Sequence, residues 1–84
     1  MQKSIFSREQ IALQRLLQRL RRNAGLRQSD LAERLSKPQP FVSRYEKGEK
    51  LLDLVELRQI CHALGTTLPE FVRDYEDELA KSPP

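Results

Sequence analysis

Residues 26–64 read LRQSDLAERLSKPQPFVSRYEKGEKLLDLVELRQICHAL, and the rest of the chain is interpreted around them. Two short helical patterns, 28–35 and 39–46, are separated by only a few residues. Asp53 begins a third helix, because it forms a D-x-x-E capping pattern with Glu56. A connection this short makes the first two helices cross steeply, so the second helix protrudes from the body of the domain.

A further helix is predicted before this segment. Ser7 and Gln10 form a capping-box pattern, and Phe6 and Ile11 occupy the two positions of a hydrophobic staple. Apolar residues then follow helical spacing, which predicts a helix over 8–24. A glycine follows at once, as is common after a helix end.

Another helix is predicted after the segment, because Thr67 and Glu70 form a T-x-x-E capping pattern. Its apolar side consists of Leu68, Phe71, Val72, Tyr75 and Leu79. Tyr75 and Leu79 either extend the core or form a dimer contact. Residues 81–84 cannot continue a helix, and residues 80–84 are expected to form a mobile tail.

The composition fits one small globular domain, residues 1–84. The 84 residues, 38% of them apolar and 32% charged, argue against disorder. No strand pattern occurs, so we expect an all-α, compact five-helix fold. The single cysteine, Cys61, allows no disulfide within the chain. The N-terminus lacks the apolar run of a signal peptide, and no run of about 18 apolar residues occurs, so we expect a cytoplasmic protein without a membrane segment.

Charge is distributed unevenly along the chain. Residues 1–50 carry twelve Lys or Arg and five Asp or Glu, residues 51–84 carry three and seven, and the net charge is +3. The basic half indicates a surface for a polyanion, although the bias also fits an ordinary solvated surface. The acidic half contains a cluster formed by Asp74, Glu76, Asp77 and Glu78. This cluster is either a solvated face or a surface that attracts a protein partner or guides dimer pairing.

The helix predicted over 39–46 carries Gln, Ser and Arg side chains that can hydrogen-bond to base edges in a DNA major groove. The chain also resembles the helix-turn-helix domain of the phage-repressor and Cro family, the XRE family, over residues 16–72, with 28–46 as the helix-turn-helix unit. The matched residues are Leu20, Arg21, Gly25, Leu26, Gln28, Leu31, Ala32, Leu35, Val42, Ser43, Arg44, Tyr45, Glu46, Gly48, Leu57, Ile60, Ala63, Leu64, Gly65 and Leu68. The resemblance implies a lambda-repressor-like fold whose second unit helix enters the major groove of double-stranded DNA, and homodimers that bind two half-sites.

By position, the resemblance assigns base reading to Gln39, Pro40, Ser43 and Arg44, with Phe41 beside them. Arg44 can donate two hydrogen bonds to guanine, Gln39 can pair with adenine, and Ser43 can meet several base edges. Phe41 either touches a thymine methyl group or packs back on Leu35 and braces the turn.

Phosphate contacts are expected in two places. The resemblance places Gln28 at a helix N-terminus, where it and backbone N–H groups hold a phosphate. Loops that flank the unit carry the further candidates Arg27, Lys37, Lys47 and Lys50. The resemblance also implies an internal ion pair between Arg21 and Glu46, with a structural role.

The sequence departs from the family pattern in three places. Arg27 stands where Ser or Thr usually caps the helix predicted over 28–35. This replacement weakens the cap and favours a phosphate contact. Ser36 replaces the usual turn glycine, at a cost of about 1 kcal/mol if its φ is positive. Pro40 disfavours the α conformation at Gln39, so the reading helix begins either at Gln39 or at Pro40 with Gln39 as its cap.

Two functions of different classes follow. The first is a sequence-specific DNA-binding transcriptional regulator, a homodimeric repressor that blocks polymerase at its operator; a position beside polymerase would instead activate. The second is a protein-interaction module or antitoxin-type protein that binds its partner through the acidic C-terminal half. An enzyme is not expected, because no catalytic constellation or phosphate-binding Gly loop occurs. No metal or cofactor is expected, since Cys61 and His62 point about 100° apart on a helix.

Overall fold

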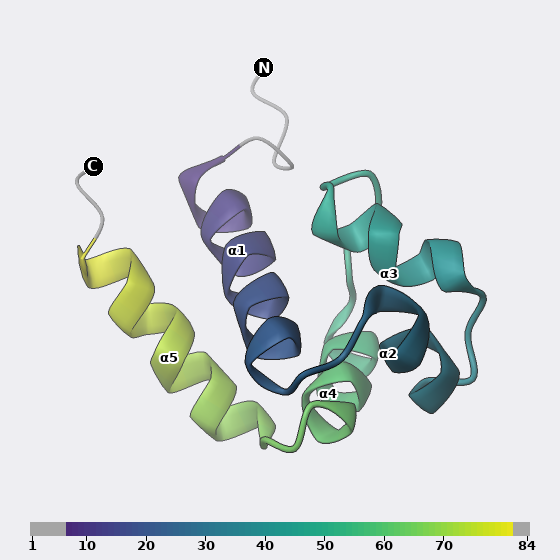
Figure 1. Cartoon of the computed structure of the whole chain (residues 1–84). Coiled ribbons are helices and arrows are strands. Elements are labelled where there is room, and N and C mark those ends of the chain that lie inside the picture. The colour runs from purple at the N-terminus through teal and green to yellow at the C-terminus, as the bar shows by residue number, and fades with distance from the viewer. Residues whose placement is uncertain (1–6, 82–84) are drawn as a thin grey trace.

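The computed structural model describes residues 7–81, which form five α-helices and no strand (Figure 1). The helices are α1 (Arg8–Asn23), α2 (Gln28–Arg34), α3 (Gln39–Glu46), α4 (Leu54–Ala63) and α5 (Leu68–Lys81). The expected all-α, five-helix fold is therefore confirmed. Two helices end one residue before the predicted bounds, because Ala24 and Leu35 are the C-caps of α1 and α2.

Positive φ values explain where these two helices end. Gly25 follows the first C-cap with a φ of 74°, and Ser36 follows the second with a φ of 56°. A residue in this left-handed region cannot continue a right-handed helix. At the C-terminus, α5 includes Ala80 and Lys81, which we had assigned to the tail. The remaining tail residues, 82–84, lie outside the described part of the chain.

The predicted N-terminal caps form where the sequence places them. The Gln10 amide donates to Ser7 Oγ over 3.0 Å. Asp53 and Glu56 form a reciprocal box, in which each carboxylate accepts the other residue's amide N–H, at 2.7 and 3.0 Å. The Phe6 half of the predicted staple lies outside the described residues. These caps satisfy amide groups that have no partner within the helix.

Every helix contributes to one hydrophobic core. Its buried members are Leu16, Leu17, Leu31, Ala32, Val42, Tyr45, Ile60, Cys61 and Phe71. Cys61 is fully buried and the adjacent His62 is exposed, as the helical spacing predicts. Burial raises the pKa of the Cys61 thiol to about 11, so it stays protonated as a small core side chain.

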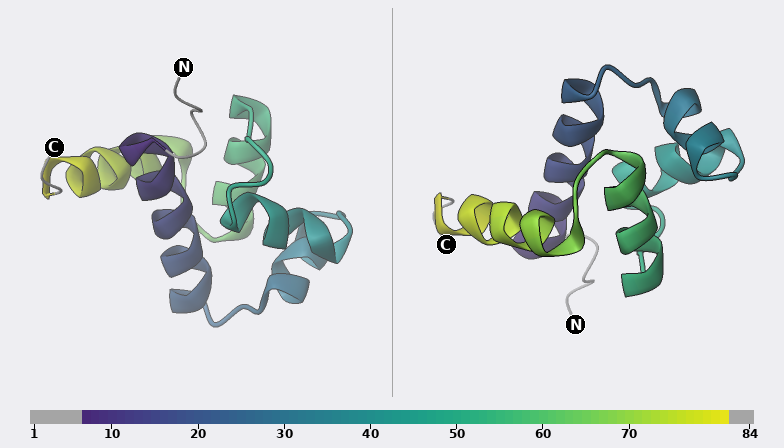
Figure 2. Two further views of the ribbon diagram at one scale, coloured as in Figure 1. Left: turned by 90° about the horizontal axis from the view of Figure 1, so that it is seen from above. Right: turned by 90° about the horizontal axis from the view of Figure 1, so that it is seen from below.

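The helices form two sides of the molecule. α2 packs on α3, α1 contacts both α3 and α5, and α5 also contacts α4. The views in Figures 1 and 2 place α2 and α3 on one side and α1 and α5 on the other. α3 therefore has core contacts along one face and solvent along the other.

Polar contacts attach the acidic helix α5 to α1. Arg19 and Glu78 form an ion pair of 2.9 Å. The Tyr75 hydroxyl donates to the Glu9 carbonyl over 3.0 Å, and Arg8 donates to the Leu79 carbonyl over 3.1 Å. Tyr75 is half-buried against the core, which favours the core alternative for this residue.

Candidate nucleic-acid interface

The two faces of α3 differ in exposure. Val42 and Tyr45 are buried, because they lie on the face that meets the core. The residues assigned to base reading lie on the other side: Gln39, Pro40 and Arg44 are exposed and Ser43 is half-buried. Within the described part of the chain, the Arg44 side chain makes no hydrogen bond or ion pair. Its guanidinium therefore keeps all its donors for an external acceptor.

α3 begins at Gln39, not at Pro40. Pro38 is the N-cap, with φ −62° and ψ 150°, and its carbonyl accepts the Phe41 amide over 3.0 Å. Pro40 is tolerated at the second helical position, where a backbone N–H has no partner within the helix. The alternative in which Gln39 caps the helix is therefore wrong. Its side chain makes no hydrogen bond to another described residue.

Phe41 packs on its own helix and is covered by two lysines. Its ring meets Tyr45 edge to face, with 5.5 Å between the ring centroids. The Lys37 and Lys50 amines lie 5.3 and 5.7 Å from the Phe41 centroid, within cation–π range. The packing alternative for Phe41 therefore has a partner on the same helix, Tyr45. The half-buried ring retains an exposed part at the edge of α3.

Glu46 joins three helices at the end of α3. Arg21 Nε and Nη2 donate to the Glu46 carboxylate over 2.7 and 3.1 Å, and the two side chains are only 8% and 2% exposed. The hydrogen bond with Glu46 raises the pKa of Arg21 against the opposing effect of burial. Arg21 Nη1 also donates to the Leu26 carbonyl over 2.8 Å. The ion pair implied by the resemblance is thus present in the structure.

Gln28 has an additional partner that sequence reasoning missed. Its side-chain amide donates to Glu46 Oε1 over 3.0 Å. Gln28 is the first residue of α2, as expected, and the Glu46 carboxylate orients its amide group. No local pattern signals this contact, because the two residues are 18 positions apart.

Arg27 is partnered within its own turn. Its Nε and Nη2 donate to the Asp30 carboxylate over 3.1 and 3.0 Å, and Asp30 also accepts the Arg27 amide over 2.9 Å. These hydrogen bonds raise the pKa of Arg27 and lower the pKa of Asp30. Asp30 thus forms one half of a capping box, whereas the Arg27 side chain caps no amide of α2. The R-x-x-D spacing was the sequence signal for this pair.

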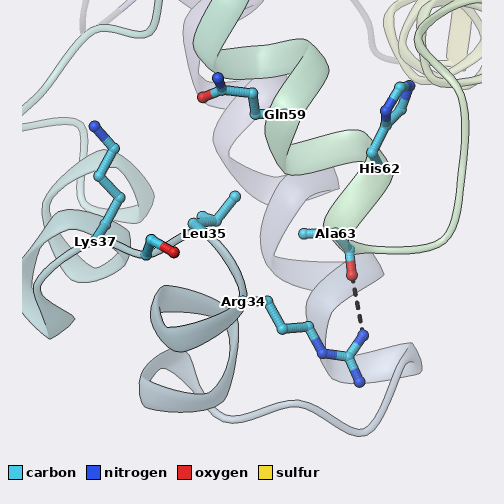
Figure 3. A pocket seen from close by; sticks show the side chains of 7 residues that line it. Arg34, Leu35, Lys37, Gln59, His62 and Ala63 are labelled. Atoms are coloured by element: carbon cyan, nitrogen blue, oxygen red, sulfur yellow. Dashed lines mark hydrogen bonds between the residues drawn. The ribbon is translucent and has the colours of Figure 1, made fainter.

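A hollow of about 620 Å³ lies between the turn that links α2 to α3 and the C-terminal half of α4 (Figure 3). Arg34 Nη1 donates across it to the Ala63 carbonyl over 3.1 Å, which links the end of α2 to the end of α4. Lys37 lines the same hollow but extends away from Arg34 (Figure 3). Among the base and phosphate candidates, only Lys37 borders this hollow.

No group of three or more His, Cys, Asp or Glu side chains within residues 7–81 is arranged to hold a metal ion. None of the described helices is both long and apolar enough to cross a membrane.

Comparisons with known proteins agree with this geometry. A family model for a helix-turn-helix domain matches residues 12–73. An XRE-family like protein from Pseudomonas syringae pv. tomato str. DC3000 is 38% identical, with a TM-score of 0.76 over 87% of this chain and 85% of that one. The clp gene regulator ClgR from Corynebacterium glutamicum is 28% identical, with a TM-score of 0.73 over 82% of this chain and 73% of that one. No curated protein matches.

A third structure is similar in fold. The wild-type restriction-modification controller protein C.Esp1396I has a TM-score of 0.83 over 89% of this chain and 99% of that one. Its sequence identity is 21%, so the likeness concerns the arrangement of the helices alone.

Proposed function

Since the chain belongs to the XRE family of helix-turn-helix DNA-binding transcriptional regulators, we propose that it is a homodimeric repressor that reads an inverted-repeat operator with α3. The observation that carries this proposal is the exposed Arg44, which has no partner among residues 7–81 and lies on a helix whose opposite face is buried in the core. The family consists of regulators and not of enzymes. The working place of such a protein is the cytoplasm, at the nucleoid when it is bound to DNA.

In the proposed complex, α3 lies in the major groove. Arg44 donates two hydrogen bonds to a guanine, Gln39 pairs with an adenine, and Ser43 meets a neighbouring base edge. Pro40 contributes apolar contact at the groove floor, and Phe41, which is packed on Tyr45, lies beside it. Gln28, Arg27, Lys37, Lys47 and Lys50 bind phosphates on the two sides of the groove and set the register of α3. Bound at an operator, the protein represses by occluding polymerase.

An exposed apolar patch supports the proposed homodimer. Among the described residues, Leu51, Leu54 and Val55 are 48%, 67% and 66% exposed, and they are neighbours in the chain at the start of α4. A second copy that packs on this patch removes it from water. The domain measures 36 × 27 × 21 Å, so two copies side by side can present their α3 helices about 34 Å apart, one turn of DNA.

A named relative supports a regulatory role. ClgR, which is 28% identical to this chain, is described as a clp gene regulator. Control of gene expression is compatible with an α3 that reads DNA.

A second candidate function is a protein-interaction module or antitoxin-type partner. It is favoured by the exposed carboxylates of Asp74, Glu76 and Asp77 on α5. Glu78, by contrast, is engaged with Arg19 of α1. This function predicts little salt-dependent affinity for DNA, whereas DNA binding predicts a steep loss of affinity with rising salt.

Selection from a random-duplex library tests the proposal, with wild type, Arg44→Ala and Lys47→Ala compared in parallel. Wild type is expected to enrich an inverted repeat. Arg44→Ala is expected to relax the preference at one base in each half-site, because it removes a base contact. Lys47→Ala is the matched control: it is expected to weaken binding to all sequences alike and to reduce the salt slope by about 1, since it removes a phosphate contact.

Two results would count against the repressor. Failure of wild type to enrich any sequence at moderate salt would favour the interaction module. An unchanged sequence preference in folded Arg44→Ala would remove Arg44 from the set of base-reading residues.

A further inference from the structure

A second hollow lies beside α3 and contains an ordered group of charges. It has a volume of about 470 Å³, and its lining includes Lys37, Phe41, Arg44, Lys50 and Glu56. Lys37 precedes α3 and Lys50 follows it, so cations from both ends of the helix reach one place. Three cations around one hollow form a site for an anion, and Glu56 is its single carboxylate.

The Phe41 ring holds the two lysines in this arrangement. Their amines lie 5.3 and 5.7 Å from the ring centroid, and the ring itself is fixed against the buried Tyr45. A lysine side chain loses much rotamer freedom when it binds one phosphate. Part of that loss is already incurred in the free protein, because the ring restricts both side chains before DNA arrives.

Glu56 competes with the DNA backbone for Lys50. Its Oε2 lies 3.2 Å from Lys50 Nζ, and its Oε1 accepts the Asp53 amide over 3.0 Å. The capping bond keeps the carboxylate in place at the start of α4. A phosphate that binds Lys50 must therefore compete with a fixed internal anion.

We infer that Phe41 is a positioning residue which holds Lys37 and Lys50 at one phosphate of the DNA backbone, and that Glu56 limits the affinity by competing for Lys50. The inference rests on the proposed function. It assigns Phe41 and Glu56 to the strength of backbone binding and not to the choice of bases. The effect is accordingly the same for every DNA sequence.

The first test is Glu56→Gln, measured by fluorescence anisotropy on a duplex of random sequence at fixed salt. Gln at this capping position still accepts the Asp53 amide, so the variant removes the charge and keeps the cap. The matched control is Glu49→Gln in the loop that precedes α4, since Glu49 is exposed and its side chain makes no ion pair with a described residue. Glu56→Gln is expected to bind about threefold more tightly than Glu49→Gln, the gain typical of an exposed ion pair.

A double-variant cycle separates competition from general charge. In a Lys50→Gln background, the difference between Glu56→Gln and Glu49→Gln is expected to disappear, because the group for which Glu56 competes is gone. Equal gains from the two glutamine variants would overturn the role of Glu56. A gain that persists without Lys50 would overturn it as well.

The second test concerns the ring. Phe41→Leu keeps an apolar side chain but loses the cation–π contacts, and is expected to bind the same duplex about threefold more weakly. Phe41→Tyr keeps the ring and serves as the rescue variant. With Lys37 and Lys50 both replaced by Gln, Phe41→Leu is expected to have no further effect.

The outcomes distinguish this inference from the function on which it rests. A folded Phe41→Leu protein that binds as well as wild type would overturn the role of Phe41 while leaving DNA binding intact. Should Phe41→Leu fail to fold, as judged by thermal unfolding, Glu56→Gln still decides the competition, because its cap is preserved. If the wild-type protein bound no duplex even at low salt, the proposed function and this inference would both be overturned.

Discussion

Ser36 has a backbone conformation that favours glycine. Its φ is 56°, and it is the only non-glycine residue with positive φ in the described chain. The conformation is needed because the chain must leave α2 and enter α3 within a few residues. The strain is therefore stored at the turn that orients α3.

Ser36→Gly is expected to raise the free energy of unfolding by about 1 kcal/mol, because glycine adopts this φ without a Cβ clash. Urea unfolding monitored by circular dichroism measures the change. Ser36→Ala is the control, since it keeps the Cβ and should bring no comparable gain. Equal stabilisation by both variants would show that the serine hydroxyl, and not the backbone strain, carries the cost.

Tyr45 buries a hydroxyl that has no hydrogen-bond partner among the described residues. The residue is 2% exposed, and burial raises the pKa of its phenol, so the group stays neutral. Tyr45→Phe is expected to stabilise the fold by about 1 kcal/mol, because it removes an unsatisfied polar group and keeps the ring. Thermal and urea unfolding test this expectation. A clear destabilisation would point to a buried water bound to the hydroxyl.

At the scale of the elements, Glu46 connects α3 to α1 through Arg21 and to α2 through Gln28. Glu46→Gln leaves the buried Arg21 without a counter-charge, so we expect a loss of about 3 kcal/mol in unfolding free energy. Glu49→Gln, an exposed change of the same type, should alter stability little. A loss below about 1 kcal/mol for Glu46→Gln would mean that the pair behaves like an exposed one.

The docking of α5 on α1 is expected to depend on pH. A hydrogen bond from Arg19 lowers the pKa of the Glu78 carboxyl below its ordinary value. A group with a lowered pKa in the folded state contributes stability above its unfolded pKa and loses it as pH falls through the folded pKa. Glu78→Gln should therefore be less stable than wild type at pH 7, with a difference that vanishes in acid.

Urea unfolding of both proteins from pH 7 down to pH 2 measures this difference. Glu76→Gln is the control, because Glu76 is exposed on the same helix and forms no ion pair with a described residue. A difference for Glu78→Gln that stays constant over the whole range would assign the effect to packing and not to charge.

At the scale of the whole molecule, two exposed apolar surfaces are candidates for the interface of the proposed dimer. The start of α4 exposes Leu54 and Val55, while α5 exposes Val72, which is 44% accessible. Val55→Glu is expected to weaken dimerisation at least tenfold, which is about 1.4 kcal/mol, because it puts a charge into an apolar patch whose burial stabilises the proposed dimer. Sedimentation analysis across a concentration series measures this. Val72→Glu is the matched control, and a larger effect from it would place the interface on α5.

The starts, caps and buried faces of the helices could be read from the sequence. Ser7, Asp53 and Thr67 mark three helix starts, and the burial of Val42 and Tyr45 follows from helical spacing. These features depend on residues within one or two turns of each other, so local patterns are sufficient. The proposal that α3 reads DNA also rests on its short connection to α2 and on the side chains of its outer face.

The partners of the charged side chains depended on how the helices pack. Gln28 meets Glu46 across 18 positions, and Arg19 meets Glu78 across 59. The two lysines over Phe41 come from loops on opposite sides of α3. Such contacts depend on crossing angles and loop paths, which result from packing the whole core and leave no periodic trace in the chain. The sequence thus specified which groups the interface carries, and packing selected which of them are held by neighbours and which remain available to DNA.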